Sequence, residues 1–377
     1  MSERWQPTCS FGREKPKKGR FGELMRILVT GHKGYIGAVM APWLAAAGHE
    51  VVGLDSDLFE QCTFGEPLVD FPSIRKDLRD VEASDLEGFD ALIHLAGLSN
   101  DPLGNLNPEL TYDINHEASV RLARLAKEAG VGRFLFSSSC STYGKAGDEI
   151  LNEEAEFNPV TPYARSKVLV ERDVAPLADK NFSPVFLRNA TAYGVSPRLR
   201  FDLVLNNLVA WAFATGRVYI KSDGTPWRPI VHIEDISRAF LAALEAPREL
   251  VHNQAFNVGR SQENYQIHDL AEIVKVAVPG CVIEYAPDAG PDTRCYRVDF
   301  SRITKVLPGF QPRWDAARGA RELYDVYRRV GLRVEDFEGP RYKRIDHIQR
   351  LLATGQLDSS LRWQTPNAVQ VLHAKSS

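Results

Sequence analysis

The sequence predicts an α/β protein: a Rossmann-type, doubly wound parallel sheet followed by a smaller, interleaved domain. Short β-branched runs alternate with helical stretches from residue 26 to about 190. Such alternation is typical of parallel strands joined by right-handed crossovers. Beyond Tyr193 the rhythm loosens into loops that contain proline and arginine, which indicates a different architecture.

The predicted elements of the large sheet follow one another at short intervals. The expected strands are Arg26–Thr30, Val51–Leu54, Asp90–Leu95, Phe134–Ser138 and Val185–Arg188, and the expected helices are Ala38–Ala47, Pro108–Ala129 and Tyr163–Ala178. In the second part, Phe256–Gly259, Ile267–Val276 and Ala316–Val330 are expected to belong to the smaller domain. Ligands of open α/β sheets bind at the carboxyl ends of the strands, so the cleft between the two parts is the predicted active site.

Composition argues against several classes of function. Hydrophobic residues make up 44% and charged residues 25% of the chain, and the formal net charge is -3, too small to attract nucleic acid or an anionic membrane. The five cysteines lack CxxC spacing, which argues against a disulfide framework and a zinc site and favours a reducing cytoplasm. No apolar run reaches the roughly 18 residues that a membrane span needs. We therefore expect a small-molecule substrate.

The segment after the first strand, TGHKGYIG, carries a glycine pattern that is typical of nucleotide binding. Gly31 permits a tight turn, Gly34 lets the backbone approach a pyrophosphate, and Gly37 allows the helix to pack closely on the sheet. A purely structural turn is the alternative for the glycines alone. Asp55, at the end of the second strand, adds a carboxylate where one binds a ribose diol. Together these features predict a dinucleotide cofactor.

Charge favours NAD over NADP, because Asp55 repels a 2′-phosphate, although Lys33 offers a compensating positive charge. Asp77, followed by Leu78, lies where a third strand is expected to end, and its carboxylate is a candidate acceptor for the adenine amino group. A solvated turn aspartate is the alternative. HLAG at 94–97 ends another strand with small residues that suit a backbone packed against a cofactor. The other predicted cofactor contacts in these motifs are Tyr35, Ile36, Leu95, Ala96 and Gly97.

Tyr163 and Lys167 stand four residues apart on a predicted helix, so both project from the same face. An ammonium beside a phenol favours phenolate and lowers the pKa of the tyrosine, which can then exchange a proton with a substrate hydroxyl. Ser139, near the end of the preceding strand, supplies a hydroxyl to the same oxygen. The three residues predict an acid–base site.

These motifs occur in one order with SSSCSTYG at 137–144 and with Asn115 in the long helix. Together they resemble the extended short-chain dehydrogenases/reductases that act on nucleotide sugars, the NAD-dependent epimerase/dehydratase family. The resemblance covers roughly residues 26–325. It implies that Tyr163 is the general base, that Lys167 also binds the nicotinamide ribose, and that Ser139 positions the reacting sugar oxygen.

The resemblance also implies further contacts. Ser137 is a predicted cofactor contact, and Asn115 supports the lysine through water, with a solvent-facing helix residue as the alternative. In the second part, Arg228 and Arg294 match arginines that bind the phosphates of the sugar nucleotide, a task suited to guanidinium groups. The remaining predicted substrate contacts are Thr191 and Asn206.

The sequence departs from the family pattern beside the predicted catalytic serine. Dehydratases of the family usually have Asp-Glu there, whereas this chain has Cys140 and Ser141. Cys140 is therefore a candidate acid or base, since a thiol near a cofactor can titrate near neutrality. A small buried thiol that only packs is the alternative. Thr191 replaces a common asparagine, and Pro229 a common aspartate, so the sugar is left open.

The expected organisation has four regions. Residues 1–24 are a flexible extension, 25–192 the NAD-binding domain, and 193–340 mainly the substrate-binding domain, with some segments returning to the first. Residues 341–377 form a helical extension and tail. Apolar residues within 341–363 predict an amphipathic helix that caps the substrate domain or builds an oligomer contact.

The resulting functional prediction is a cytoplasmic NAD-dependent nucleotide-sugar epimerase that acts through a transient keto-sugar, as a homodimer. The alternatives are a nucleotide 4-keto-sugar reductase that uses NAD(P)H, then a nucleotide-sugar dehydratase. A non-catalytic NAD-binding regulator is a further alternative, because this fold also serves proteins without catalysis. No nucleic acid, membrane or metal is expected as a partner.

Overall fold

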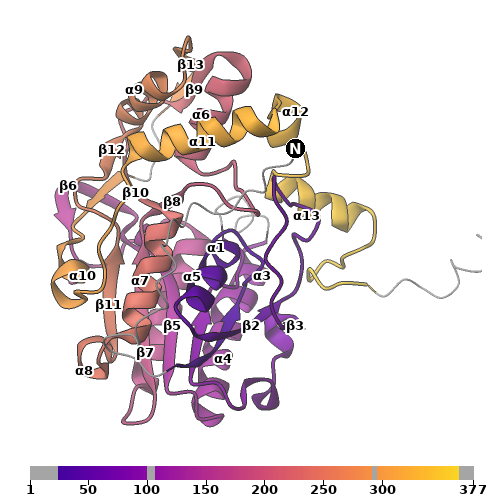
Figure 1. Ribbon diagram of the computed structural model, residues 1–377, viewed down its shortest axis with the longest axis vertical. Helices are drawn as coiled ribbons and strands as arrows, with labels where there is room; N and C mark the ends of the chain where they lie inside the picture. The colour runs from indigo at the N-terminus through magenta and orange to yellow at the C-terminus, as the bar shows by residue number, and fades with distance from the viewer. Residues whose placement is uncertain (1–23, 100–106, 291–294, 365–377) are drawn as a thin grey trace, which may run out of the picture.

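The five strands predicted for the large domain lie in one sheet of seven strands, in the order β11-β7-β5-β4-β1-β2-β3 (Figure 1). The computed structural model describes residues 24–99, 107–290 and 295–364. The strands are β1 (Arg26–Thr30), β2 (Glu50–Asp55), β3 (Ser73–Arg75), β4 (Ala91–His94), β5 (Arg133–Ser139), β7 (Ser183–Asn189) and β11 (Gln254–Val258). Every neighbouring pair is parallel. This arrangement confirms the predicted α/β, Rossmann-type fold.

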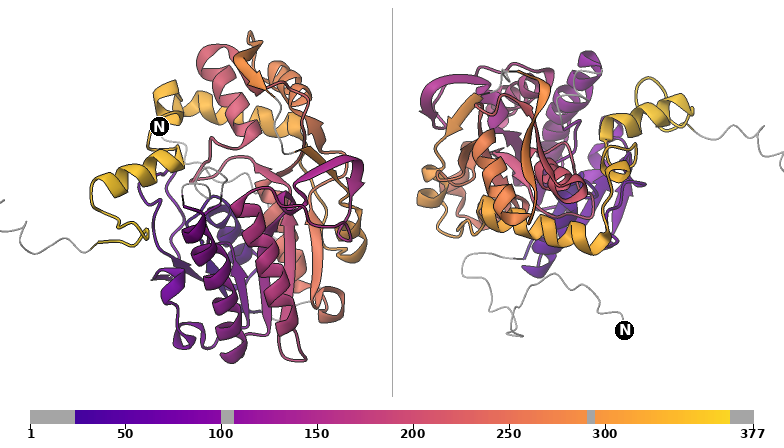
Figure 2. Two further views of the ribbon diagram at one scale, coloured as in Figure 1. Left: turned by 180° about the vertical axis from the view of Figure 1, so that it is seen from behind. Right: turned by 90° about the horizontal axis from the view of Figure 1, so that it is seen from above.

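Helices cover both faces of the sheet (Figures 1 and 2). Helices α1 (Gly37–Ala46) and α7 (Ile233–Glu245) contribute to the core on one face, and α4 (Ala118–Glu128) and α5 (Pro162–Val174) to the core on the other. On β1, Ile27 and Val29 belong to the first core and Leu28 to the second. The side chains alternate in this way because successive residues of a strand point to opposite faces.

A π-helical turn interrupts the helix predicted at 108–129. The observed segments are α3 (Pro108–Tyr112), the π turn (Asp113–Glu117) and α4. Such turns are frequent at functional sites. Here the turn carries Asn115, which is only 3% exposed. A uniform helical period does not predict this local change.

A second group of elements forms the upper part of the molecule in Figure 1. It contains β8 (Thr191–Tyr193), β10 (Trp227–His232) and β12 (Asn264–Gln266) in one small sheet, and β9 (Arg217–Ser222) with β13 (Val282–Gly290) in another. Helices α6 (Val204–Thr215), α9 (Ile267–Ala277) and α11 (Ala316–Val330) pack with them around a core that includes Leu205, Leu270 and Leu323. A further strand pair joins β6 (Lys145–Leu151) to β14 (Cys295–Val298).

One segment lies in a different sheet from the one expected. Phe256–Gly259 was grouped with the smaller domain, but β11 pairs with β7 and forms an edge of the large sheet. Local sequence does not distinguish the two locations, because a short apolar strand suits either sheet.

The remaining α-helices in the described ranges are α8 (Arg248–Val251), α10 (Ser301–Val306), α12 (Val334–Phe337) and α13 (Arg344–Ala353). Within those ranges, no helix has the length and apolar character that crossing a membrane requires.

The C-terminal helix α13 lies against the first half of the chain (Figures 1 and 2). Its Ile348 and Leu351 share a small core with Leu98, and Phe59 packs against that core. The helix therefore contacts the loops that follow β4 and β2 of the large sheet. The sequence offered a cap on the smaller domain or an oligomer contact, and the structure shows this third arrangement.

A buried ion pair connects α5 to β7 beneath the carboxyl end of β5. The Arg188 guanidinium lies 2.7 Å from a Glu171 carboxylate oxygen, and both side chains are 7% exposed. Ser138 Oγ donates a hydrogen bond of 2.5 Å to the same carboxylate, and Arg188 also donates to the Tyr143 hydroxyl at 3.0 Å. Removing one member leaves the opposite charge buried without its partner.

We expect Glu171→Ala to lower the free energy of unfolding by about 3 kcal/mol, because it leaves a buried guanidinium unpaired. Urea denaturation of the cofactor-free protein measures the change. The matched control is Glu272→Ala, which breaks a half-exposed pair with Lys275 and should change stability by less than about 0.5 kcal/mol. Equal effects of the two substitutions would contradict the assignment of the Glu171–Arg188 pair as a stabilising contact.

Candidate functional site

The glycine turn after β1 packs directly on the end of β4. Gly31 has a φ of +73°, and a Cβ placed on it would lie 2.8 Å from the backbone nitrogen of Ala96. A Cβ on Gly37 would lie 2.3 Å from the Gly31 carbonyl oxygen. Larger residues are excluded at both positions by backbone that cannot move aside, so this close turn requires glycine.

Asp55 is held in place by backbone donors at the end of β2. Its carboxylate accepts hydrogen bonds from the Lys33 backbone N–H at 3.1 Å and from the Asp57 N–H at 3.0 Å. The Lys33 ammonium lies 2.9 Å from an Asp57 carboxylate oxygen. The sequence left open that the positive charge of Lys33 could bind a 2′-phosphate. That charge is already paired with Asp57, which supports the preference for NAD.

The predicted cofactor residues of the strand ends line one pocket. They are Gly31, Gly34, Tyr35, Ile36, Gly37, Asp55, Asp77, Leu78, Leu95, Ala96 and Gly97. The other predicted cofactor residues, Lys33, Asn115, Ser137, Tyr163 and Lys167, are not part of its lining. The pocket thus lies where the glycine turn, the ends of β2 and β4, and the segment after β3 meet.

Asp77 lines this pocket but is also bound to Arg79. One carboxylate oxygen accepts from the Arg79 backbone N–H and Nε, both at 2.9 Å, and the other accepts from Nη2 at 2.7 Å. The sequence left open whether Asp77 accepts from the adenine amino group or is a solvated turn residue. Neither description is complete, because the carboxylate is bound by Arg79 and also lines the pocket. Its adenine contact stays a prediction.

Tyr163 and Lys167 lie one turn apart on α5, as predicted. The Lys167 ammonium lies 5.6 Å from the centroid of the Tyr163 ring and donates a hydrogen bond of 2.7 Å to the Ser137 carbonyl oxygen on β5. Burial lowers the pKa of Lys167 to about 8. Ser139 lies at the end of β5, and its hydroxyl accepts a bond of 3.1 Å from the Ser141 N–H. Ser137 therefore holds the lysine through its backbone oxygen.

Asn115 has a role that the sequence did not predict. Its amide clamps the backbone of Leu98: Oδ1 accepts from the Leu98 N–H at 2.7 Å, and Nδ2 donates to the Leu98 oxygen at 2.9 Å. The solvent-facing alternative is wrong, because the residue is buried. The π turn brings this amide to the loop after β4 and fixes one wall of the pocket.

The structure does not support an acid or base role for Cys140. Its side chain is fully buried, belongs to the core on the α1 face, and donates from Sγ to the Arg188 carbonyl oxygen at 3.1 Å. Burial raises the pKa of the thiol well above its ordinary value. The packing thiol, which the sequence left as the alternative, describes the residue.

The predicted substrate residues lie in different surroundings. Asn206 is fully buried, and its amide bonds to backbone atoms of Gly194 and Arg200 and to the Tyr35 hydroxyl, which corrects its assignment as a substrate contact. Thr191 is half-buried on β8. Arg228, on β10, is 7% exposed and donates to the Trp227 carbonyl oxygen at 2.9 Å. Arg294 lies outside the described residues, as does most of the loop 98–107.

Two arginines that the sequence did not single out line the cofactor pocket, Arg200 and Arg344. Arg200 follows β8, where no motif marks it, and its guanidinium lies 2.6 Å from Asp202. Arg344 begins α13, beyond the region that resembles the family. Isolated arginines in a chain with this many give no sequence signal, so only the tertiary contacts reveal them.

Comparison with known proteins places this geometry in a family. The model of the NAD dependent epimerase/dehydratase family matches residues 27–259, more than half of the chain. The chain belongs to this family. Membership confirms the predicted resemblance and, at the level of the family, an NAD-dependent enzyme.

Similar proteins cover most of the chain. The UDP-glucose 4-epimerase of Neisseria meningitidis serogroup A is 29% identical over 326 residues, which are 78% of this chain and 95% of the relative. The structure of UDP-glucose-4-epimerase from Stenotrophomonas maltophila, with bound NAD and formylated UDP-arabinopyranose, gives a TM-score of 0.72 at 25% identity, covering 81% of this chain and 99% of the other. MoeE5 in complex with UDP-glucuronic acid and NAD gives 0.70 at 27% identity, covering the same shares.

The pocket residues fit the family's cofactor. The glycine turn leaves no side chain between backbone and pocket, the α1 N-terminus favours an anion there, and Asp55 is held as an acceptor at the pocket edge. These three features together are typical of a dinucleotide site.

Gly37→Ala should weaken NAD binding at least about tenfold, because the added Cβ collides with the backbone of the glycine turn. Isothermal titration calorimetry on cofactor-free protein measures this. Gly132→Ala is the control, since its Cβ would meet its nearest neighbour only at 3.7 Å and should leave NAD affinity unchanged. Unchanged affinity in both variants would refute the assignment of the glycine turn.

Lys167 should make the cofactor-free protein more stable as the pH rises above about 8. Its pKa of about 8 in the folded protein lies below the ordinary lysine value of about 10.4, so the unfolded chain binds the proton more tightly between these values. Lys167→Met should remove this part of the rise. Urea denaturation between pH 7 and 10 compares the two slopes, and parallel curves would contradict the burial of a titrating lysine.

Proposed function

We propose that the protein is an NAD-dependent nucleotide-sugar epimerase that acts through a transient keto-sugar. The observation that carries the proposal is the Lys167 ammonium beside the Tyr163 ring, with both residues on one helix. The chain also belongs to a family in which the proteins similar to it include UDP-glucose 4-epimerases. Bound NAD supplies the acceptor and donor of the hydride. The residues of this chain then provide the proton transfer and the orientation of the sugar.

Tyr163 is the proposed general base for the reacting sugar hydroxyl. The buried ammonium of Lys167 stabilises the phenolate that this role requires, and its bond to the Ser137 oxygen fixes the ammonium in place. Ser139 would donate its hydroxyl to the same sugar oxygen. When the sugar becomes a ketone, Tyr163 holds the proton, and it returns that proton after the hydride reaches the other face of the same carbon.

The surroundings of Cys140 favour epimerisation over dehydration. Dehydration needs an acid and a base beside the serine, but Cys140 is fully buried with a raised pKa. Ser141 supplies only a hydroxyl, whose oxygen is buried without a hydrogen-bond partner among the described residues. Epimerisation needs neither group. The intact tyrosine and lysine also argue against a purely regulatory NAD-binding protein.

We further propose that residues 193–340 mainly bind the sugar nucleotide, with Arg228, Arg294 and Thr191 as contacts, and that residues 25–192 form the NAD-binding domain. A homodimer in the cytoplasm is the proposed state of the enzyme. The domain roles and contacts follow from the family pattern, and the homodimer and the cytoplasmic location follow from the sequence prediction.

Tyr163→Phe should lower kcat by about 10²-fold or more, because the general base is lost, while NAD affinity stays near that of the wild type. The substrate is first chosen by thermal stabilisation of the NAD-loaded protein with UDP-, GDP-, CDP- and dTDP-sugars. Proton NMR then follows conversion of that sugar. Tyr285→Phe is the control, because this tyrosine is exposed and hydrogen-bonds only to His268 in the described structure.

The same assay separates the epimerase from a keto-sugar reductase. An epimerase converts the sugar without net use of cofactor, and the protein retains NAD through purification. Protein that lacks bound NAD and consumes NADH with a keto-sugar would overturn the proposal. Full activity in Tyr163→Phe would overturn the role of the tyrosine.

A further inference from the structure

The C-terminal segment, residues 344–364, forms one side of the cofactor region although it lies beyond the matched family region. Its helix α13 and the loop after it contribute Ile348, Leu351, Leu357 and Leu361 to a small core with Leu98. Leu361 and Arg344 also line the cofactor pocket. Residues more than 240 positions apart in the chain therefore share one pocket wall.

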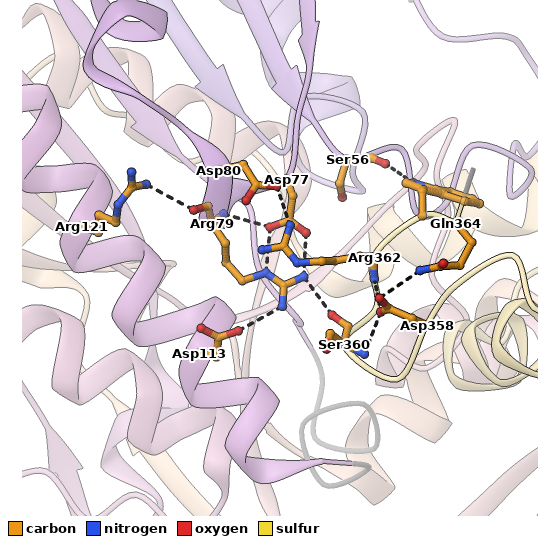
Figure 3. Close-up of polar contacts among 11 residues, drawn as sticks. Ser56, Asp77, Arg79, Asp80, Asp113, Arg121, Asp358, Ser360, Arg362 and Gln364 are labelled. Atoms are coloured by element: carbon orange, nitrogen blue, oxygen red, sulfur yellow. Dashed lines mark hydrogen bonds and ion pairs between the residues drawn. The ribbon is translucent and has the colours of Figure 1, made fainter. Parts of the chain in front are cut away.

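Polar contacts hold the end of this segment against the loops after β2 and β3 (Figure 3). Arg79, which binds Asp77 of the pocket, also donates to the Ser360 carbonyl oxygen at 2.9 Å. Arg362 pairs with Asp80, and the Trp363 indole N–H donates to the Ser56 oxygen at 2.6 Å. The segment is thus bonded to the same loops that carry the cofactor residues.

Arg344 is a buried cation that lines this pocket. The residue is 8% exposed, and its guanidinium carbon lies 4.2 Å from the centroid of the Phe59 ring. Among the described residues it forms no ion pair and no hydrogen bond from its guanidinium. A buried cation without an anionic partner is unfavourable, so the position calls for an anionic ligand.

The charges around Arg344 indicate where that anion lies. Arg200 adds a second cation to the pocket, and Asp202, the carboxylate beside it, is already paired with Arg200. The Arg200 backbone is tied to the glycine turn, because Asn206 donates both to the Arg200 oxygen and to the Tyr35 hydroxyl. Asp55 lies at the ribose end and would repel a 2′-phosphate. Both arginines line the same pocket as the glycine turn, which in this type of fold lies beside the diphosphate of a dinucleotide.

We propose that Arg344 binds the diphosphate of the dinucleotide together with Arg200, so that the C-terminal segment completes the cofactor site. This inference rests on the cofactor and not on the epimerase activity. Contacts of the C-terminal segment would then slow the release of a bound dinucleotide. The arrangement favours an enzyme that keeps its cofactor through the reaction.

Arg344→Met tests the contact in the full-length, cofactor-free protein. Calorimetric titration should show the Kd of NAD and of ADP-ribose rising together by at least about tenfold, with adenosine binding unchanged. Lys343→Met is the matched control, because Lys343 is an exposed cation beside Arg344, does not line the pocket, and forms ion pairs only with Glu338 and Asp346 among the described residues. It should leave all three ligands unaffected.

Other outcomes overturn the proposal. Unchanged NAD affinity would show that Arg344 does not bind the cofactor, and an equal loss for adenosine would show a merely structural effect. In a parallel titration with NADP, a loss confined to that ligand would place the 2′-phosphate there instead. Circular dichroism and urea denaturation check the fold, and Arg344→Lys, which keeps the charge, should restore part of the affinity.

A second variant tests the segment without changing the pocket lining. Arg362→Ala removes the pair with Asp80 and should speed the dissociation of bound NAD several-fold, measured by stopped-flow displacement. An unchanged dissociation rate would show that the segment does not retain the cofactor. These binding measurements stand whether the enzyme proves to be an epimerase or a reductase.

Discussion

The contact between the glycine turn after β1 and the end of β4 is the constraint on which the site depends. β1 lies between β2 and β4, so a turn that packs on Ala96 brings the ends of three strands to one place. Asp55 then reaches the turn through backbone bonds, and Asn115 holds the neighbouring loop by its Leu98. Without the close approach at Gly31, these residues would not surround one pocket.

Buried charges are paired beneath the large sheet's strand ends, but two buried cations in the site region have no carboxylate partner in the described part of the chain. Glu171 and Arg188 neutralise one another beneath β5, and additional hydrogen bonds satisfy both groups. Lys167 and Arg344 are buried cations with no carboxylate bound to either among the described residues. Burial lowers the pKa of each, to about 8 for Lys167 and about 10 for Arg344. Both therefore weaken the ligand-free fold and become favourable beside an anion, which is a common compromise between stability and function.

Sequence patterns predicted much of the fold because strands, helices and tight turns depend mainly on residues close together in the chain. The strand Arg26–Thr30 has the predicted bounds, the segment Ala316–Val330 expected in the smaller domain is a helix with those bounds, and the glycine turn follows the first strand as its motif requires. The interruption at Asp113–Glu117 was not predicted, since a π turn adds one residue to a turn of helix and a uniform helical period does not reveal that addition. Cys140 was a candidate acid or base and Asn206 a candidate substrate contact by their positions in the chain, and their burial decided otherwise.

The sequence by itself determined the α/β alternation, the glycine turn, the acidic residue at the end of β2, and the spacing of Tyr163 and Lys167. Each of these depends on neighbours within one turn or one strand, so residue types in order are enough to reveal them. Only the tertiary structure decided that Lys33 pairs with Asp57, that Cys140 faces the core, and that Arg344 reaches the cofactor pocket. These depend on contacts between distant segments, which packing and charge select in the folded chain.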